Sequence, residues 1–196
     1  MKGEGELVAA VLWRRVNDVG TDAMRLWRRE GGWRIAGSAV FLEEGRVVDL
    51  AYQVDCDAAW RTRWGVARGH WGGRAIDVEV SGEADGGWRW NGRRVPEVAG
   101  CVDFDLNFSP ATNLITFRRM QLKVGERAEV PVAWLKVPEF ELQRLPQTIV
   151  RVEARTYDYA APTVGYAGKL VVDEHQFVLE YPELWTAARV EVFAER

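Results

Sequence analysis

The sequence predicts an all-β protein: a large curved antiparallel sheet, in the form of a half-barrel or β-roll, with at most one or two short helices. Apolar and polar residues alternate with a period of two along most of the chain, which is typical of strands with one face in a core and one in water. Short clusters of glycine and other turn-forming residues separate the alternating runs. The composition, with 10 tryptophans and 19 glycines among 196 residues, suits such an aromatic-rich β protein.

Four runs show the alternation most clearly and are predicted to form strands: Arg46–Cys56, Arg74–Ser81, Thr148–Thr156 and Gly165–Val172. In the third run, Val150 and Val152 are expected on one face and Ile149 on the other. Pairs of turn-forming residues lie between such runs, among them Gly31-Gly32, Gly72-Gly73 and Asn91-Gly92. At ordinary strand lengths, the chain accommodates roughly a dozen strands.

One segment favours a short helix, near Leu114–Met120, and it follows Ser109-Pro110. A serine caps the first turn of a helix through its side-chain oxygen. A proline fits the first helical position, because the N–H that it lacks would have no partner there. The helix is therefore expected directly after this pair.

The chain is predicted to form a single domain over residues 1–196, because no Pro- or Ser-rich linker divides it. A weak internal repeat relates residues 33–66 to residues 164–190. Each segment leads from a Gly-containing apolar run, through two adjacent acidic residues, to a Tyr and then a Trp. Duplication into two related halves would explain this repeat, and so would the convergent patterning of antiparallel hairpins.

Charge and motifs exclude several classes of function. The 26 Lys and Arg residues against 29 Asp and Glu give a net charge of −3, which argues against nucleic-acid binding. Two histidines and two distant cysteines predict no metal site, and no nucleotide-binding motif occurs, so no cofactor is expected. No apolar stretch approaches the ~20 residues that span a bilayer. The first apolar run ends at Arg14-Arg15 without a cleavage pattern, so a cytoplasmic location is expected.

The densest group of polar residues in the sequence surrounds Asp103 and Asp105, which share one face of a predicted strand. Two carboxylates at this spacing could act in acid–base chemistry, since each raises the pKa of the other when buried. They could instead form ion pairs with Arg118 or Arg119, which follow the next turn. The structural pairing is favoured, and at least one of these arginines is predicted to contact Asp103 or Asp105.

The string Asp103-x-Asp105-Leu106-x-x-Ser109-Pro110-x-Thr112-Asn113 resembles the family described as putative glycolipid-binding. Further pieces match in order, from about Trp13 to Trp185, including Ala133-Trp134-Leu135, Gln147, Tyr159 and Tyr181-Pro182. The chain departs from the family at Ile115-Thr116-Phe117, where Leu-Pro-Ile is usual. The resemblance implies a strongly curved antiparallel sheet, similar to the half-barrels of bacterial lipoprotein carriers, and a role in binding glycolipids. Asp103, Asp105, Ser109, Pro110, Thr112 and Asn113 are expected to form the structural motif.

The favoured hypothesis is a non-catalytic binding module that holds an amphipathic, lipid-like ligand, such as a glycolipid, in an apolar groove. No catalytic residue is assigned in it. Aromatic side chains suit such a groove, because they offer both an apolar face and a polar edge. The ligand-binding residues are expected to be Trp64, Trp134 and Tyr181 on the walls, and Asp105, Arg118 and Arg119 at the polar head, unless these three are paired internally.

Two alternatives remain open. One is a hydrolase or isomerase that acts on a glycolipid or a similar small molecule, with Asp103 or Asp105 as acid or base. The other is a homodimeric interaction scaffold that uses a sheet edge or an apolar patch.

Overall fold

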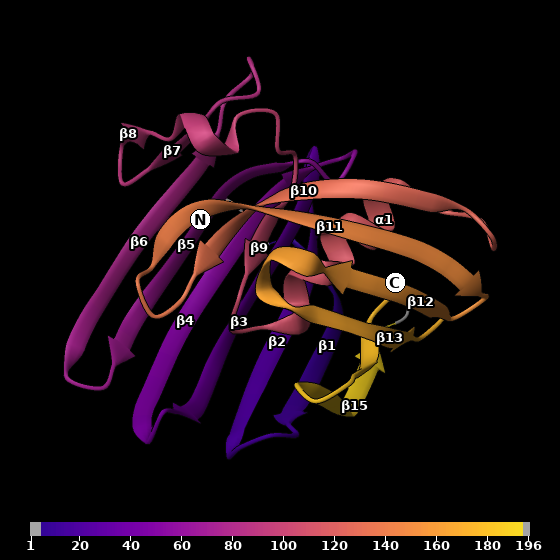
Figure 1. The fold of residues 1–196 in the computed structure, drawn as a ribbon, viewed down its shortest axis with the longest axis horizontal. Coiled ribbons are helices and arrows are strands. Elements are labelled where there is room, and N and C mark those ends of the chain that lie inside the picture. Colours follow the sequence, from indigo (N-terminus) through magenta and orange to yellow (C-terminus); the bar gives the residue numbers. More distant parts are fainter. Residues whose placement is uncertain (1–4, 194–196) are drawn as a thin grey trace.

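The computed structural model describes residues 5–193, and in them all 15 strands belong to a single sheet (Figure 1). Its strand order is β8-β7-β6-β5-β4-β3-β2-β1-β15-β14-β13-β12-β11-β10-β9, so the chain's first and last long strands meet in the middle. We call β1–β8 the large arm and β9–β15 the small arm. The predicted domain also covers residues 1–4 and 194–196, which lie outside the described residues.

The large arm is an up-and-down meander of mostly long strands. Its strands are β1 (Glu6–Arg15), β2 (Gly20–Arg29), β3 (Gly32–Glu43), β4 (Arg46–Asp57), β5 (Thr62–Trp71), β6 (Arg74–Gly82), β7 (Trp88–Trp90) and β8 (Arg93–Arg94). Every neighbouring pair among them is antiparallel. The predicted runs at Arg46–Cys56 and Arg74–Ser81 correspond to β4 and β6, and their alternate residues are buried as expected.

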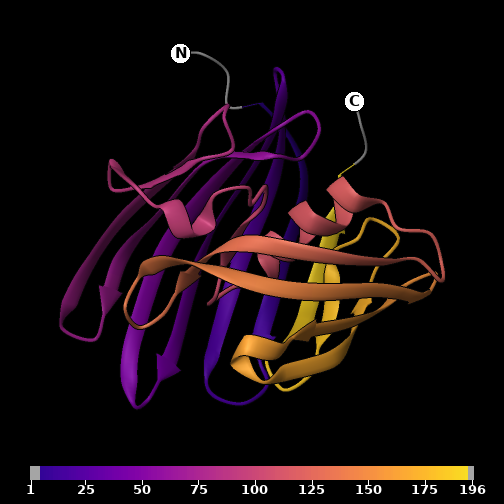
Figure 2. The same ribbon diagram turned by 45° about the horizontal axis from the view of Figure 1, so that its top comes forward.

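The small arm curls over the large arm, and β10 and β11 cross in front of it in two views (Figures 1 and 2). Its strands are β9 (Phe104–Leu106), β10 (Arg127–Lys136), β11 (Glu141–Glu153), β12 (Thr156–Ala161), β13 (Tyr166–Val172), β14 (Val178–Tyr181) and β15 (Trp185–Val192). All its neighbouring strands are antiparallel except β9 and β10.

The parallel pairing of β9 with β10 makes the sheet mixed, whereas the sequence predicted an antiparallel one. The reason is the connection between these strands, which contains the 3₁₀ turn η2 (Pro110–Thr112) and the helix α1 (Asn113–Met120). A crossover of this length carries the chain back to the opposite end of the sheet, so the next strand starts from the same end as β9 and runs in the same direction. The all-β class itself is confirmed.

The short predicted helix is confirmed as α1. Ser109 accepts a hydrogen bond from the N–H of Ala111 at 3.0 Å, and Pro110 follows at the first position of η2. The helix ends at Gln121, which adopts a left-handed conformation with φ of 48°. The other short turns in the described residues are η1 (Pro96–Val98) and η3 (Pro162–Val164).

The predicted strand over Thr148–Thr156 is wrong in its extent. The chain turns between Glu153 and Thr156, so the run is the end of β11 and the start of β12. The buried side chain is Ile149, with 1% exposure, whereas Val150 is only partly buried. Ile149 and Val150 thus lie on opposite faces, as the alternation predicted, and the neighbouring strands hold β11 in the register that turns Ile149 inward.

The segment with β9, η2 and α1 fills the inside of the rolled sheet. Phe104, Leu106, Phe108 and Ile115 are buried against inward side chains of the large arm. Gly65 on β5 makes room for this segment, because a Cβ atom there would lie 2.9 Å from the Phe104 ring. The large arm therefore has a closed core, built partly by residues that come later in the chain.

The two segments of the suggested repeat occupy different arms. Residues 33–66 cover β3, β4 and the start of β5, and residues 164–190 cover β13, β14 and most of β15. Each contains an antiparallel hairpin. The common origin of the two segments stays a prediction.

Candidate functional site

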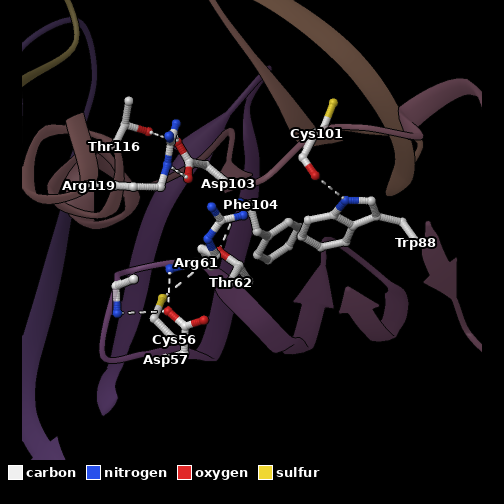
Figure 3. A network of polar contacts seen from close by, with 11 residues as sticks. Cys56, Asp57, Arg61, Thr62, Trp88, Cys101, Asp103, Phe104, Thr116 and Arg119 are labelled. Atoms are coloured by element: carbon white, nitrogen blue, oxygen red, sulfur yellow. Dashed lines mark hydrogen bonds and ion pairs between the residues drawn. The ribbon is translucent and has the colours of Figure 1, made fainter. Parts of the chain in front are cut away.

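The carboxylate of Asp103 forms a buried ion pair with Arg119 (Figure 3). The Nε and Nη2 atoms of Arg119 donate to its two oxygens at 2.6 and 2.8 Å, and the hydroxyl of Thr116 donates at 2.9 Å. Asp103 is 1% exposed. The predicted contact between an aspartate and an arginine is confirmed, and it ties α1 to the residue that precedes β9.

Other residues of the sequence motif hold the local backbone. The hydroxyl of Thr112 accepts a hydrogen bond from the N–H of Leu106 at 3.1 Å, so the turn after β9 folds back on the strand. The hydroxyl of Thr62, on β5, accepts from the N–H of Phe104 at 3.1 Å. Together with the Ser109 cap, these bonds fix the position of β9 inside the roll.

Asp105 lies on β9 and faces a cavity of about 200 Å³ in the small arm. Trp134, its direct neighbour on β10, forms one wall. The remaining lining combines aromatic and polar side chains with an apolar edge, and includes Asn107, Ser109, Asn113, Tyr159, Val164, Tyr166, Tyr181, Leu184 and Trp185. The cavity is therefore aromatic on its walls and carries a carboxyl group.

Three tyrosines from successive strands form a cluster on the cavity wall. The rings of Tyr159 and Tyr181 are 5.8 Å apart, and that of Tyr166 lies 5.9 and 5.3 Å from them. The Tyr166 hydroxyl donates to the carbonyl of Pro182 at 3.0 Å. Burial, together with the charge of Asp105, raises the pKa of Tyr159 and of Tyr181, so both hydroxyls keep their protons.

Asp105 forms no ion pair with any residue between 5 and 193. Gln147 on β11 donates to it from Nε2 at 3.3 Å. Burial raises the pKa of Asp105 to about 6, and the nearby charge of Asp103 adds to the rise against the effect of Gln147. Near neutral pH, this carboxyl group is a hydrogen-bond acceptor with one weak partner of its own, facing open space.

A second buried carboxylate, not identified from the sequence, lies behind the cavity. Asp22 on β2 is fully buried and accepts hydrogen bonds from the hydroxyls of Tyr52, at 2.9 Å, and Ser109. Burial raises its pKa to about 7, in spite of these two donors. Tyr52 reaches Asp22 across β3 because Gly37 has no side chain in its way. The available signal was an acidic residue in the apolar phase of β2, between Gly20 and Met24.

The structure separates the residues that were predicted to bind ligand together. Asp105, Trp134 and Tyr181 line one cavity. Arg119 is paired with Asp103, and Arg118 lines a different cavity. Trp64 lies beside Asp55 and Ser81 on the outward face of β5, away from these cavities.

Residues 5–193 contain neither a cluster of metal ligands nor a membrane-spanning helix. No group of three or more His, Cys, Asp or Glu side chains among them is arranged to hold a metal ion. None of their helices is long and apolar enough to cross a membrane.

These features define a β protein whose single rolled sheet holds a small aromatic cavity. The chain belongs to the family described as putative glycolipid-binding, whose model matches residues 10–187. Its fold is similar to that of a DUF1089 family protein from Pseudomonas aeruginosa, with a crystal structure at 1.80 Å resolution. The two share 27% sequence identity over 89% of this chain and 94% of the other, with a TM-score of 0.76. No curated protein matches the chain.

Proposed function

We propose that this protein is a non-catalytic binding module for an amphipathic, lipid-like ligand, and that the Asp105 cavity takes the ligand's hydroxyl-bearing head, such as a sugar ring. The observation that carries the proposal is the unpaired Asp105 carboxyl group, which faces a cavity walled by Trp134 and three tyrosines. The description of the family agrees with a glycolipid as the ligand.

The chemistry of the lining suits a sugar better than a simple hydrocarbon. A carboxylate accepts hydrogen bonds from the hydroxyl groups of a ring, and the rings of Trp134 and Tyr181 offer flat faces to its C–H groups. The buried side chains of Ser109 and Asn113 add further polar groups on the same cavity. A purely apolar ligand would leave the Asp105 carboxylate with Gln147 as its one donor, which is unfavourable.

The size and edge of the cavity support a division of the ligand into two parts. A volume of about 200 Å³ is smaller than most sites for drug-sized molecules, and suits a single ring. Val164, which is 49% exposed, and the partly buried Leu184 form an apolar edge. An alkyl chain attached to the ring would leave along this edge. The apolar groove expected from the sequence would be this small cavity, since β9 and α1 fill the inside of the large arm.

Octyl glucoside and free glucose are suitable probes, titrated against the full chain by calorimetry below the detergent's micelle concentration. We expect saturable binding of octyl glucoside that weakens about tenfold or more in Asp105→Asn and in Tyr181→Leu. Asp158→Asn is the matched control, because Asp158 is an exposed aspartate on β12 that pairs with Lys169. Weaker binding of glucose than of octyl glucoside would show that the octyl chain of the ligand contributes to the affinity.

The proposal fails if octyl glucoside does not bind, or if it binds equally well to the two cavity variants. The same samples show whether a reaction occurs. Release of glucose from octyl glucoside by the wild type, lost in Asp105→Asn, would replace the binding role with a hydrolytic one.

A further inference from the structure

Arg118 lines a second cavity, of about 390 Å³, at the opposite end of α1 from the Asp105 cavity. Its guanidinium group is half-buried, yet the side chain has no hydrogen bond or ion pair with any described residue, and its Nε atom is buried without a partner. Burial lowers the pKa of Arg118, and only Asp173 opposes this effect. A cationic group in such a position lacks the counter-charge that a partly buried arginine ordinarily has.

An aromatic stack holds the guanidinium group of Arg118 in place. The group lies over the ring of Trp60, 5.6 Å from its centroid. Trp60 is in turn stacked on Trp33 at 4.7 Å, with 16° between the ring planes. A guanidinium on an aromatic face keeps its edge, where the N–H groups are, free for another partner.

A second arginine lines the same cavity. Arg151 lies over the ring of Tyr157 at 5.6 Å and donates to the carbonyls of Leu122, at 2.8 Å, and Ala154. Its Nε atom is also buried without a partner. The acidic residue on the lining, Glu174, is paired at 3.0 Å with Arg155. The cavity therefore has two arginines, and its one carboxylate is engaged elsewhere.

The cavity lies where three turns converge, and each turn places a strained residue on its lining. Trp60, Gln121 and Gln176 have φ values of 63°, 48° and 71°, and they belong to the β4–β5 turn, the end of α1 and the β13–β14 turn. Seven non-glycine residues in the described chain have positive φ, so three of them meet at one cavity. Left-handed backbone is unfavourable for such residues, and it is found where the surrounding structure requires it, often at binding sites.

We propose that this cavity binds a phosphate-type oxyanion, held by the free edge of the Arg118 guanidinium, with Arg151 as a second positive charge. The planar fork of an arginine matches two oxygens of a phosphate group. The guanidinium is already partly desolvated and held on Trp60, so little ordering is needed when the anion binds. The site is separate from the Asp105 cavity and does not depend on its function. The phosphate belongs either to a free ion or to a lipid headgroup.

Two arms of one experiment distinguish these sources. In the first, inorganic phosphate is titrated at constant ionic strength, and the NMR signals of the arginine Nε–H and tryptophan indole groups are followed. In the second, the protein is sedimented with vesicles of phosphatidylglycerol or of phosphatidylcholine. We expect saturable shifts of the Arg118 and Trp60 signals with free phosphate, or sedimentation with phosphatidylglycerol vesicles alone.

Three variants assign the effect to the site. Arg118→Met keeps an apolar stem over Trp60 and is expected to weaken binding about tenfold or more. Arg118→Lys keeps the charge without the fork, and is expected to lose less. Arg189→Met is the matched control, since Arg189 is an exposed arginine on β15 and 73% of its side chain is accessible.

The proposal is overturned if the wild type shows neither saturable phosphate shifts nor preference for phosphatidylglycerol. It is also overturned if Arg118→Met, with an unchanged backbone spectrum, binds as well as Arg189→Met. Should Arg118→Met fail to fold, Arg118→Lys decides, because equal binding by Arg118→Lys and the wild type would exclude the guanidinium fork.

Discussion

The two arms of the sheet have the same alternating pattern but a different interior. In the large arm, the inward positions carry apolar residues such as Met24, Leu26 and Leu50, and β9 and α1 pack against them. The small arm also has a closed part, around Leu170, Val172 and Val178, but Tyr159, Tyr166 and Tyr181 of β12, β13 and β14 line an open cavity. The arms thus differ in what packs against the inward face: β9 and α1 fill the large arm, whereas the tyrosines of the small arm are left facing open space.

Three aspartate carboxylates differ between the arms in the number of donors that contact them. Asp22, in the large arm, has two hydroxyl donors and no access to solvent. Asp103, at the junction with α1, has an arginine and a threonine. Asp105, in the small arm, has a single amide donor and a cavity in front of it. Completeness of hydrogen bonding, rather than burial alone, therefore distinguishes the structural carboxylates from the one at the candidate site.

The largest effect is expected from breaking the ion pair at the junction of the arms. Arg119→Ala should lower the free energy of unfolding by about 3–5 kcal/mol, because it leaves the buried Asp103 carboxylate without its cation. Arg127→Ala is the control, since Arg127 forms an exposed pair with Glu129, which is worth at most about 1 kcal/mol. Urea unfolding curves measure both. Equal small losses would mean that the pair does not hold α1 in place.

The closed interior of the large arm is tested by filling the gap at Gly37. A Cβ atom there would overlap the Tyr52 hydroxyl and lie 2.7 Å from the carbonyl of Ala23. Gly37→Ala should therefore displace Tyr52 from Asp22 and cost about 2 kcal/mol in urea unfolding. Gly73→Ala is the matched control, because no atom lies within 4 Å of a Cβ atom at Gly73. A Gly37→Ala variant as stable as the control would contradict the tight crossing of Tyr52.

A pH series compares the carboxylates of the two arms. The pKa values of Asp22 and Asp105 are raised from 3.8 to about 7 and about 6, so the folded state holds these protons more tightly than the unfolded state. Their contribution to stability is full below about pH 4 and is lost as the pH rises to about 6 for Asp105 and about 7 for Asp22.

The Asp105→Asn variant removes one part of this dependence. Relative to the wild type, it should gain about 2–3 kcal/mol of stability between pH 4 and pH 7, measured by unfolding at each pH. Asp158→Asn, at an exposed position on the same arm, should show no such gain. A constant difference between Asp105→Asn and the wild type across the series would show that Asp105 has an ordinary pKa.

The smallest effect is expected at Trp64, which the sequence suggested as a ligand-binding residue. Because Trp64 lies on the outward face of β5, Trp64→Phe should leave the affinity for octyl glucoside within about twofold. Trp134→Phe, at the cavity wall, should weaken it several-fold. If Trp64→Phe weakened binding as much as Trp134→Phe, the ligand would have to contact the outer face of the large arm.

The sequence by itself determined the features that depend on near neighbours along the chain. Period-two alternation predicted β4 and β6, because successive strand residues point to opposite faces. Ser109-Pro110 predicted where α1 begins, through capping within one turn. The pairing of Asp103 with an arginine could be predicted because a lone buried carboxylate is costly. Arg118 and Arg119 are the cations that lie close to it in the sequence.

Only the tertiary structure decided which of these residues meet. Arg118 and Arg119 are adjacent in the sequence, but neighbours on a helix point about 100° apart, so one binds Asp103 and the other faces a different cavity. Asp22 on β2 and Ser109, which precedes η2, form a hydrogen bond across 87 residues of chain, and no local pattern encodes this contact. The cavity itself draws its walls from β9 to β15 and from α1. Alternation fixes the face on which a side chain lies, while the rolling of the sheet fixes what lies opposite it.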